Sequence, residues 1–215
     1  MQAVLEVLAA AALGYLLGAF PTAFLLARAR KQDVFELGSR NMGAMNTARH
    51  LGPALGALVL IIDVAKGALA AFAGLNMPLL SGSADAAGLS SATLVPALVA
   101  GAAAILGHCY SAYIGFRGGK GLATALGAAL PVYPLAGVYA VVLIVALVLI
   151  FRRSDPATLI TLFLYPLITL LTLERQGWPR DLTFLVTTGV IVNCLIGLVK
   201  HVQVYRASRR AHCHR

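Results

Sequence analysis

An otherwise apolar sequence is interrupted by Gly107-His-Cys-Tyr-Ser-Ala-Tyr-Ile-Gly-Phe-Arg-Gly-Gly-Lys-Gly121. The glycines of this stretch allow tight backbone bends in which consecutive N–H groups face an anion. Arg117 and Lys120 add charges that pair well with phosphate. The stretch therefore predicts a site for a phosphorylated ligand, placed at the surface of a bilayer by the apolar runs on either side of it.

The composition of the whole chain is typical of an integral membrane protein. Of its 215 residues, 60% are hydrophobic and only 12% are charged. Several apolar runs approach or exceed the roughly 20 residues with which a helix crosses a hydrocarbon core about 30 Å thick. The first run, from Ala3, is too long for a signal-peptide core and is followed by no cleavage signal, so we expect it to be retained as a span. We predict an all-α integral membrane bundle over residues 1–200 and a basic tail over 201–215.

The net charge of +9 does not indicate a nucleic-acid partner, because no soluble domain is present to carry a binding fold. Basic residues beside membrane spans are better explained by topology and by anionic lipid. The three cysteines, Cys109, Cys194 and Cys213, lack metal-ligand spacing and cannot all pair, which predicts free thiols. In the tail, His212 and His214 are expected to be solvated. We predict no metal and no cofactor.

Seven transmembrane helices are predicted, and the fourth is the least regular. The run from Leu122 to Phe151 is long for one helix and contains Pro131 and Pro134, which leaves two readings: one kinked helix, or a short crossing of about ten residues followed by a full one. The distribution of charge favours two crossings. With a turn at the prolines, Arg152 and Arg153 lie on the same side as the other basic loops, whereas with a single helix they do not. The predicted spans cover residues 3–27, 53–75, 92–106, a short fourth from 122, a fifth from 135, 156–173 and 182–199.

Positive charge sets the predicted orientation. In the arrangement of seven spans, 14 of the 17 lysines and arginines lie in the loops of one side or in the tail. Only Arg175 and Arg180 lie on the other side, and Lys66 is within a span. Since cytoplasmic loops carry the excess of basic residues, we expect the N-terminus outside and the C-terminus and the polar motifs in the cytoplasm.

Three segments resemble the motifs of the PlsY family, the acyl-phosphate-dependent glycerol-3-phosphate acyltransferases of bacterial membranes. They are Gly38-Ser-Arg-Asn-Met-Gly-Ala-Met-Asn-Thr-Ala-Arg49, Asp63-Val-Ala-Lys-Gly67, and Gly107-His-Cys-Tyr-Ser with Phe116-Arg-Gly-Gly-Lys-Gly-Leu-Ala-Thr124. The resemblance implies seven transmembrane helices in the bacterial cell membrane. It also implies transfer of a fatty acyl group from acyl phosphate to the sn-1 hydroxyl of glycerol 3-phosphate, giving lysophosphatidic acid and phosphate, and a peripheral partner enzyme that makes acyl phosphate.

Roles for individual residues follow from this resemblance. Arg49, Lys120 and His201 are predicted to bind the glycerol phosphate. The general base is either His108, since histidine has an ordinary pKa of about 6.5, or the departing phosphate, which the resemblance favours. The residues predicted to bind substrate or to shape the phosphate cradle are Ser39, Asn41, Gly43, Asn46, Lys66, Ser111, Arg117, Gly118, Gly119 and Gly121.

Several positions depart from the family pattern. Arg40 replaces a glycine and Met45 replaces a threonine. Val204 stands at the position of an asparagine, and Asp155 and Thr158 stand where the pattern has serines. These differences indicate a divergent enzyme, a shifted substrate preference or a catalytically weakened paralogue.

Structural alternatives accompany these assignments. Asp63 and Lys66 share one helical face, so they form either an ion pair that fixes the second span or a part of the site. His108 either braces its loop or acts in the reaction, and Ser111 is expected to be mainly a local hydrogen-bonding residue. The contrasting function is a transporter or binding protein for an anionic metabolite. A carrier, however, holds its polar groups near the midplane between repeated halves, whereas here most lie in predicted cytoplasmic loops.

Overall fold

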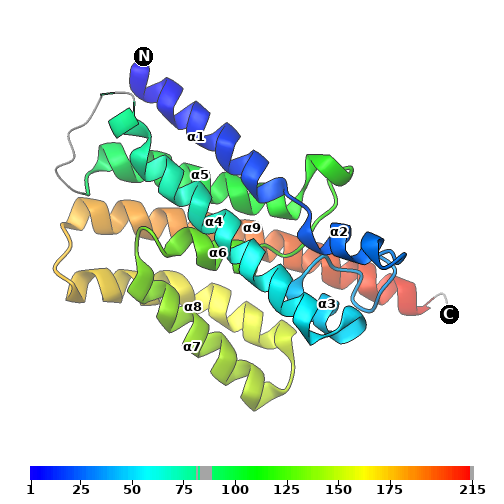
Figure 1. The fold of residues 1–215 in the computed structure, drawn as a ribbon. Helices are drawn as coiled ribbons and strands as arrows, with labels where there is room; N and C mark the ends of the chain where they lie inside the picture. Colours follow the sequence, from blue (N-terminus) through cyan, green and yellow to red (C-terminus); the bar gives the residue numbers. More distant parts are fainter. Residues whose placement is uncertain (81, 83–88, 214–215) are drawn as a thin grey trace.

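All regular structure in the described part of the chain is helical, which confirms the predicted class (Figure 1). A computed structural model describes residues 1–80, 82 and 89–213, with the side chains up to residue 207. The elements are α1 (Gln2–Ala19), α2 (Thr22–Ala29), α3 (Ala44–Leu51), α4 (Pro53–Leu80), α5 (Ser91–Cys109), the 3-10 turn η1 (Ala112–Ile114), α6 (Leu122–Ala129), α7 (Pro134–Phe151), α8 (Ser154–Arg175) and α9 (Arg180–Cys213).

Six helical segments of the described chain are long and apolar enough to cross a membrane. They are α1 together with α2, then α4, α5, α7, α8 and most of α9. Helix α6 has only 8 residues, far fewer than the roughly 20 of an ordinary span. A multi-span membrane protein is therefore supported, whereas the count of seven crossings stays a prediction.

Helix α6 lies against α4 and α5, inside the bundle. Glycines make the close approach to α4 possible: a Cβ on Gly67 would meet the backbone of Thr124, and one on Gly127 would meet the backbone of Val64. Chain direction changes after α6, and α7 begins at Pro134, whose fixed φ suits a first helical turn. The reading with two helices is thus confirmed over the single kinked helix.

The first predicted span, residues 3–27, is broken at Phe20 and Pro21 into α1 and α2. Pro21 has no N–H to donate and its ring disturbs the preceding turn, which ends the helix. Two distant side chains satisfy the carbonyls left at the break: Ser111 Oγ donates to the carbonyl of Ala19, and Lys66 Nζ donates to that of Phe20 at 3.1 Å. Neighbouring helices therefore compensate for the proline, as expected of a membrane bundle.

Other helix ends differ from the predicted ones. The prediction missed α3, α4 continues past Leu75 to Leu80, and α9 continues past Val199 to Cys213. The predicted boundary between residues 200 and 201 therefore falls inside one helix. Cys109 and Cys194 are free and buried, as predicted. The expectations for the tail histidines and for the thiol of Cys213 concern side chains outside the described ones.

The polar segments gather at one end of the bundle. Figure 1 shows α2, α3, the connection from α5 to α6, the connection from α7 to α8 and the C-terminal part of α9 at this end. The N-terminus and the turn between α8 and α9 lie at the opposite end. The basic loops thus share one end, and the membrane side that this end faces stays a prediction.

A small core anchors the segment between α2 and α3. Its side chains Val34, Phe35 and Met42 are at most 8% exposed and form one cluster with Ala23 and Val59. Because burying such side chains stabilises the segment by roughly 1.5–3 kcal/mol each, the loop that carries the first motif is held as part of the bundle.

Candidate functional site

Side chains from three distant segments meet around the carboxylate of Asp155, in the first turn of α8. Lys120 Nζ donates to Asp155 Oδ1 at 2.9 Å, and His201 Nε2 lies 3.6 Å from the same oxygen. The guanidinium of Arg49 also helps to hold the pKa of this carboxyl below its ordinary value, after the larger effects of Lys120 and His201. We call these four residues the Asp155 cluster. Lys120 and His201, both predicted to bind one phosphate, therefore lie at a single anionic group, and Arg49 acts on the same group through its charge.

The cluster is partly open to solvent. The side chain of Asp155 is 49% exposed and that of Lys120 is 19% exposed, whereas His201 is 3% exposed. Lys120 follows the glycines of the connection to α6, and His201 projects from α9 three residues after Leu198. The cluster thus presents a charged surface on a buried support, which suits the reversible binding of an anion.

A second group, of one aspartate, one lysine and one histidine, lies deeper in the bundle. Asp63 Oδ1 is 2.8 Å from Lys66 Nζ and 3.6 Å from His108 Nδ1. The exposed fraction of each of these side chains is 5% or less. We call these three residues the Asp63 cluster. Since Lys66 also donates to the carbonyl of Phe20, its contacts favour the structural alternative over binding of substrate.

His108 supports the glycines that precede Lys120. A Cβ on Gly119 would meet His108 Nε2 and the carbonyl oxygen of Met42. The imidazole therefore lies directly behind Gly119 and its other nitrogen faces Asp63, so this arrangement favours the bracing role over that of a general base. Met42 belongs to the first motif, and its carbonyl brings the first and third motifs into contact at Gly119.

Close packing of the backbone explains two further glycines of this connection. A Cβ on Gly118 would meet the carbonyl oxygens of His108 and Cys109. The N–H of Gly119 donates to the carbonyl of His108 at 3.1 Å, so this amide is engaged within the protein instead of facing an anion. Gly121 precedes α6 with a φ of +79°, a left-handed conformation that glycine adopts readily.

Asn46 braces the loop of the first motif. Its amide nitrogen donates to the carbonyls of Leu37 and Asn41 at 3.1 and 3.0 Å, and its oxygen accepts from the N–H of Ser39 at 3.1 Å. Gly43 ends the loop as the residue before α3. Leu37, Ser39, Asn41 and Gly43 thus lie in one folded loop, and Asn46, in the first turn of α3, holds its shape.

Arg117 and Ser111 have observed partners in the protein. The guanidinium of Arg117 lies over the ring of Phe35, with its carbon 3.7 Å from the ring centroid, which is a cation–π contact. Ser111 is buried, and its hydroxyl donates to Ala19 at the break after α1. Ser111 therefore does form a hydrogen bond, but the expectation of a local partner is wrong, because Ala19 lies 92 positions earlier in the chain.

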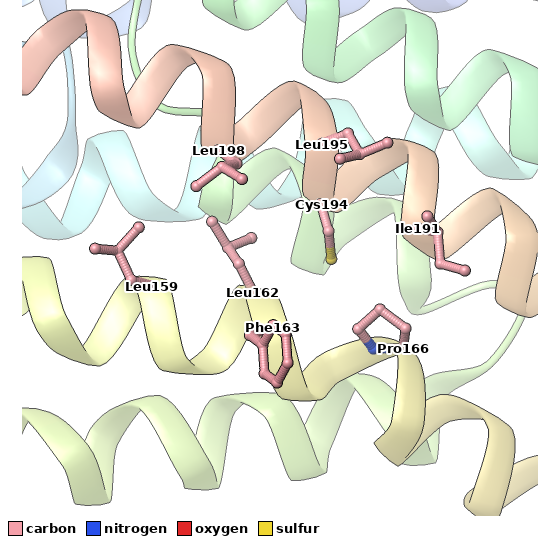
Figure 2. A pocket seen from close by; sticks show the side chains of 8 residues that line it. All are labelled: Leu159, Leu162, Phe163, Pro166, Ile191, Cys194, Leu195 and Leu198. Carbon is pink, nitrogen blue, oxygen red and sulfur yellow. The ribbon is translucent and has the colours of Figure 1, made fainter.

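An apolar groove of about 390 Å³ separates α8 from α9 (Figure 2). Leu159, Leu162, Phe163 and Pro166 line it from α8, and Ile191, Cys194, Leu195 and Leu198 line it from α9. Leu159 lies one helical turn from Asp155, and Leu198 lies one turn from His201. The groove therefore begins beside the Asp155 cluster and continues along the apolar parts of both helices.

In the sequence, Asp155 stands out only as a departure from the PlsY family pattern. An acidic residue in the first turn of a helix is ordinarily explained by the helix dipole, so its pairing with Lys120 carried no local signal. Lys200, at the end of the predicted bundle, was given no role, yet it is 7% exposed and its ammonium lies 4.2 Å from the ring centroid of Tyr110. The Tyr110 hydroxyl donates to Gln203 at 3.0 Å, so both contacts fasten α9 to the end of α5.

The amino-acid sequence of this chain is similar to those of known proteins. Residues 8–209 match the model of the family described as glycerol-3-phosphate acyltransferase. A glycerol-3-phosphate acyltransferase of Zymomonas mobilis is 44% identical over 129 residues, which cover 59% of this chain and 58% of that protein. Glycerol-3-phosphate acyltransferase 1 of Deinococcus radiodurans is 36% identical, with 82% of each chain covered. The protein of that name from Geobacter sulfurreducens is also 36% identical, with 84% of this chain and 86% of that one covered.

Two solved structures are similar as well. Both are crystal structures of PlsY, described as an integral membrane glycerol 3-phosphate acyltransferase, one in its glycerol 3-phosphate form and one in its lysophosphatidic acid form. Each has a TM-score of 0.70 and 28% sequence identity to this chain. The first similarity covers 96% of this chain and 91% of the PlsY chain, and the second covers 93% and 90%.

Proposed function

This chain belongs to the glycerol-3-phosphate acyltransferase family and is an acyltransferase, and we propose that it transfers a fatty acyl group from acyl phosphate to the sn-1 hydroxyl of glycerol 3-phosphate. The bond from the acyl carbon to the phosphate oxygen breaks, an ester to the sn-1 oxygen forms, and the products are lysophosphatidic acid and inorganic phosphate. The observation that carries this proposal is the meeting of Arg49, Lys120 and His201 beside an apolar groove.

The Asp155 cluster supplies the groups that hold phosphate. Lys120 and Arg49 offer charge-assisted hydrogen bonds, and His201 offers a ring nitrogen beside them. In the proposal these three residues bind glycerol 3-phosphate, while the loop braced by Asn46 shapes the rim of the site together with Ser39, Asn41 and Gly43. Gly118, Gly119 and Gly121 let the backbone approach closely enough to place Lys120, and Arg117 remains a second anion-binding candidate at the rim.

Chemistry at this site requires little beyond positioning. Acyl phosphate is already activated, so the protein has to hold two anionic reactants together and stabilise charge in the tetrahedral intermediate. Because His108 is buried behind Gly119, the proton of the attacking hydroxyl passes to the departing phosphate in our proposal. Lys120 is the side chain best placed to offset the charge that develops on that phosphate.

The groove between α8 and α9 suits the acyl chain of the donor. Its lining is formed by apolar side chains and Cys194, and it starts one helical turn from the Asp155 cluster. An acyl chain in this groove would place its phosphate end beside the Asp155 cluster, next to the glycerol 3-phosphate held by Arg49, Lys120 and His201. One substrate would then lie along the membrane while the other enters from the aqueous side.

We infer the finer topology from the same arrangement. Counting α6 as a short, sheltered crossing gives seven crossings and places the N-terminus outside and the basic end of the bundle in the cytoplasm. The position is the bacterial cell membrane with the site facing inward. A peripheral enzyme that produces acyl phosphate would then approach the same end.

The test is an assay of purified protein with labelled acyl phosphate and glycerol 3-phosphate. We expect lysophosphatidic acid from this pair, little product when glycerol replaces glycerol 3-phosphate, and little when acyl-CoA replaces acyl phosphate. Lys120→Ala should lower the rate by at least about 100-fold, as for loss of a donor to developing charge. Lys31→Ala removes an exposed lysine that belongs to neither cluster and serves as the matched control.

A folded wild-type protein that forms no lysophosphatidic acid with any of these donors would refute the proposed reaction. Binding of glycerol 3-phosphate by such a protein, without turnover, would instead favour the anion-binding or transport alternative. Equal activity of Lys120→Ala and Lys31→Ala would remove the Asp155 cluster from the site.

A further inference from the structure

The Asp155 carboxylate occupies the position that an anionic substrate oxygen needs. A single atom, Oδ1, accepts from Lys120 Nζ at 2.9 Å and lies 3.6 Å from His201 Nε2. Carboxylate and phosphate oxygens carry the same sign of charge and accept hydrogen bonds from the same donors. Lys120 and His201 therefore face, in this structure, a group with the recognition chemistry of phosphate.

This carboxylate can be exchanged for another anion. The Asp155 side chain is 49% exposed, so water can solvate it as soon as it turns away from Lys120. Exposed or half-exposed ion pairs are held weakly, because solvent screens the attraction and both side chains lose freedom. The position at the beginning of α8 also leaves the aspartate favourably placed near the helix dipole without its cationic partner.

Position 155 is one where this chain differs from the PlsY family pattern. The pattern has serine, whose hydroxyl is uncharged and does not compete with phosphate for a lysine. The chain instead carries a negative charge within a hydrogen bond of the residue proposed to bind the phosphate. Aspartate in place of serine should therefore affect the binding of the substrate phosphate more directly than the transfer of the acyl group.

We propose that Asp155 is a specificity-determining residue that competes with the substrate phosphate for Lys120 and His201 and thereby raises the KM for glycerol 3-phosphate. The inference rests on the proposed function of the Asp155 cluster. When phosphate binds, the carboxylate leaves both side chains and turns into water. Asp155 contacts Lys120 and His201 only while no substrate phosphate is bound. Removal of the Asp155 charge therefore changes the KM for glycerol 3-phosphate and leaves kcat nearly constant.

The experiment compares Asp155→Asn and Asp155→Ser with the wild-type protein. We expect the KM for glycerol 3-phosphate to fall by about three- to tenfold in both variants, the range for losing one half-exposed charge beside a bound anion, with kcat within about threefold of wild type. The inhibition constant of inorganic phosphate should fall by a similar factor. Asp181→Asn removes the same charge at the start of α9, at the far end of the bundle, and should leave both constants unchanged.

Binding can also be followed without turnover. Inorganic phosphate should raise the midpoint of thermal unfolding of Asp155→Asn more than that of the wild-type protein at equal concentration. If one Asp155 variant does not fold, the other provides the same comparison.

The possible failures are distinguishable. A wild-type protein without acyltransferase activity refutes the proposed function. An active wild-type protein whose Asp155 variants show an unchanged or higher KM overturns the present inference alone. A fall in kcat of more than about tenfold also overturns it, because the carboxylate would then be positioning Lys120 for the reaction.

Discussion

The Asp63 cluster and the Asp155 cluster both contain an aspartate, a lysine and a histidine in nearly the same geometry, and the Asp155 cluster contains Arg49 in addition. The distance between lysine nitrogen and aspartate oxygen is 2.8 Å in the first and 2.9 Å in the second. In both, a histidine nitrogen lies 3.6 Å from that oxygen. They differ in burial: the aspartate side chain is 4% exposed in the first cluster and 49% exposed in the second. The same kind of ion pair therefore occurs once in a buried environment and once in a half-exposed one.

Burial decides whether such an ion pair can open. Removing one partner from a buried pair leaves an uncompensated charge away from water, which is strongly destabilising. In a half-exposed pair, water or a bound anion replaces the partner at little cost. The Asp63 cluster therefore fastens α4 to the break between α1 and α2 through Lys66, whereas the half-exposed Asp155 cluster is the one that we propose to bind a ligand.

The largest expected effect comes from opening the buried cluster. Asp63→Ala should lower the free energy of unfolding by about 3–5 kcal/mol, because Lys66 would remain buried and charged. Denaturant unfolding in detergent would measure the loss. The matched variant Asp155→Ala should change the same quantity by less than about 1 kcal/mol.

A double variant separates loss of charge balance from loss of packing. Asp63→Ala combined with Lys66→Met removes both charges, and we expect it to recover part of the stability lost by Asp63→Ala. Equal stabilities for Asp63→Ala and Asp155→Ala would show that burial does not distinguish the two clusters.

A loss of stability of intermediate size is expected at Gly119, where the two clusters are in contact. Gly119 packs on His108 of the Asp63 cluster and precedes Lys120 of the Asp155 cluster. In Gly119→Ala the new methyl group would meet the carbonyl oxygen of Met42, which cannot move freely, so we expect a loss of about 1–3 kcal/mol. Thermal unfolding and acyltransferase assays would show whether stability and activity fall together.

Gly189→Ala provides the control, because the atoms nearest to its new methyl group belong to the flexible side chain of Leu98. This helical substitution should be neutral or slightly stabilising. Comparable losses for both alanine variants would contradict the role given to the contact at Gly119.

The smallest expected effect concerns the loop of the first motif, beside the Asp155 cluster. Arg40 has a φ of +54°, and the left-handed conformation disfavours residues that carry a Cβ by about 1–2 kcal/mol. Arg40→Gly removes this strain but adds freedom to the unfolded chain, so the net change in unfolding free energy should be within about 1 kcal/mol. Arg30, with a φ of −96°, is the control, since Arg30→Gly offers no such relief and should only destabilise.

Local features made much of the fold predictable. Apolar runs, prolines and basic loops were sufficient for the helical class and for the turn before α7, because hydrocarbon thickness and the missing N–H of proline act on short segments. Helix α3 was missed because it is short and polar and derives its stability from the core around Val34 and Met42. The end of α9 was missed because its last turns contain basic residues rather than the apolar ones used to recognise a span.

The motif residues could be selected from the sequence, but their separate tasks could not. Periodicity alone paired Asp63 with Lys66, since they lie three residues apart on one helix. Nothing local relates Lys120 to Asp155, 35 positions later, or either of them to His201 on α9. Only the tertiary structure brings the connection before α6 together with α8 and α9, and only burial, which depends on every neighbouring helix, separates Asp63, 4% exposed, from Asp155, 49% exposed.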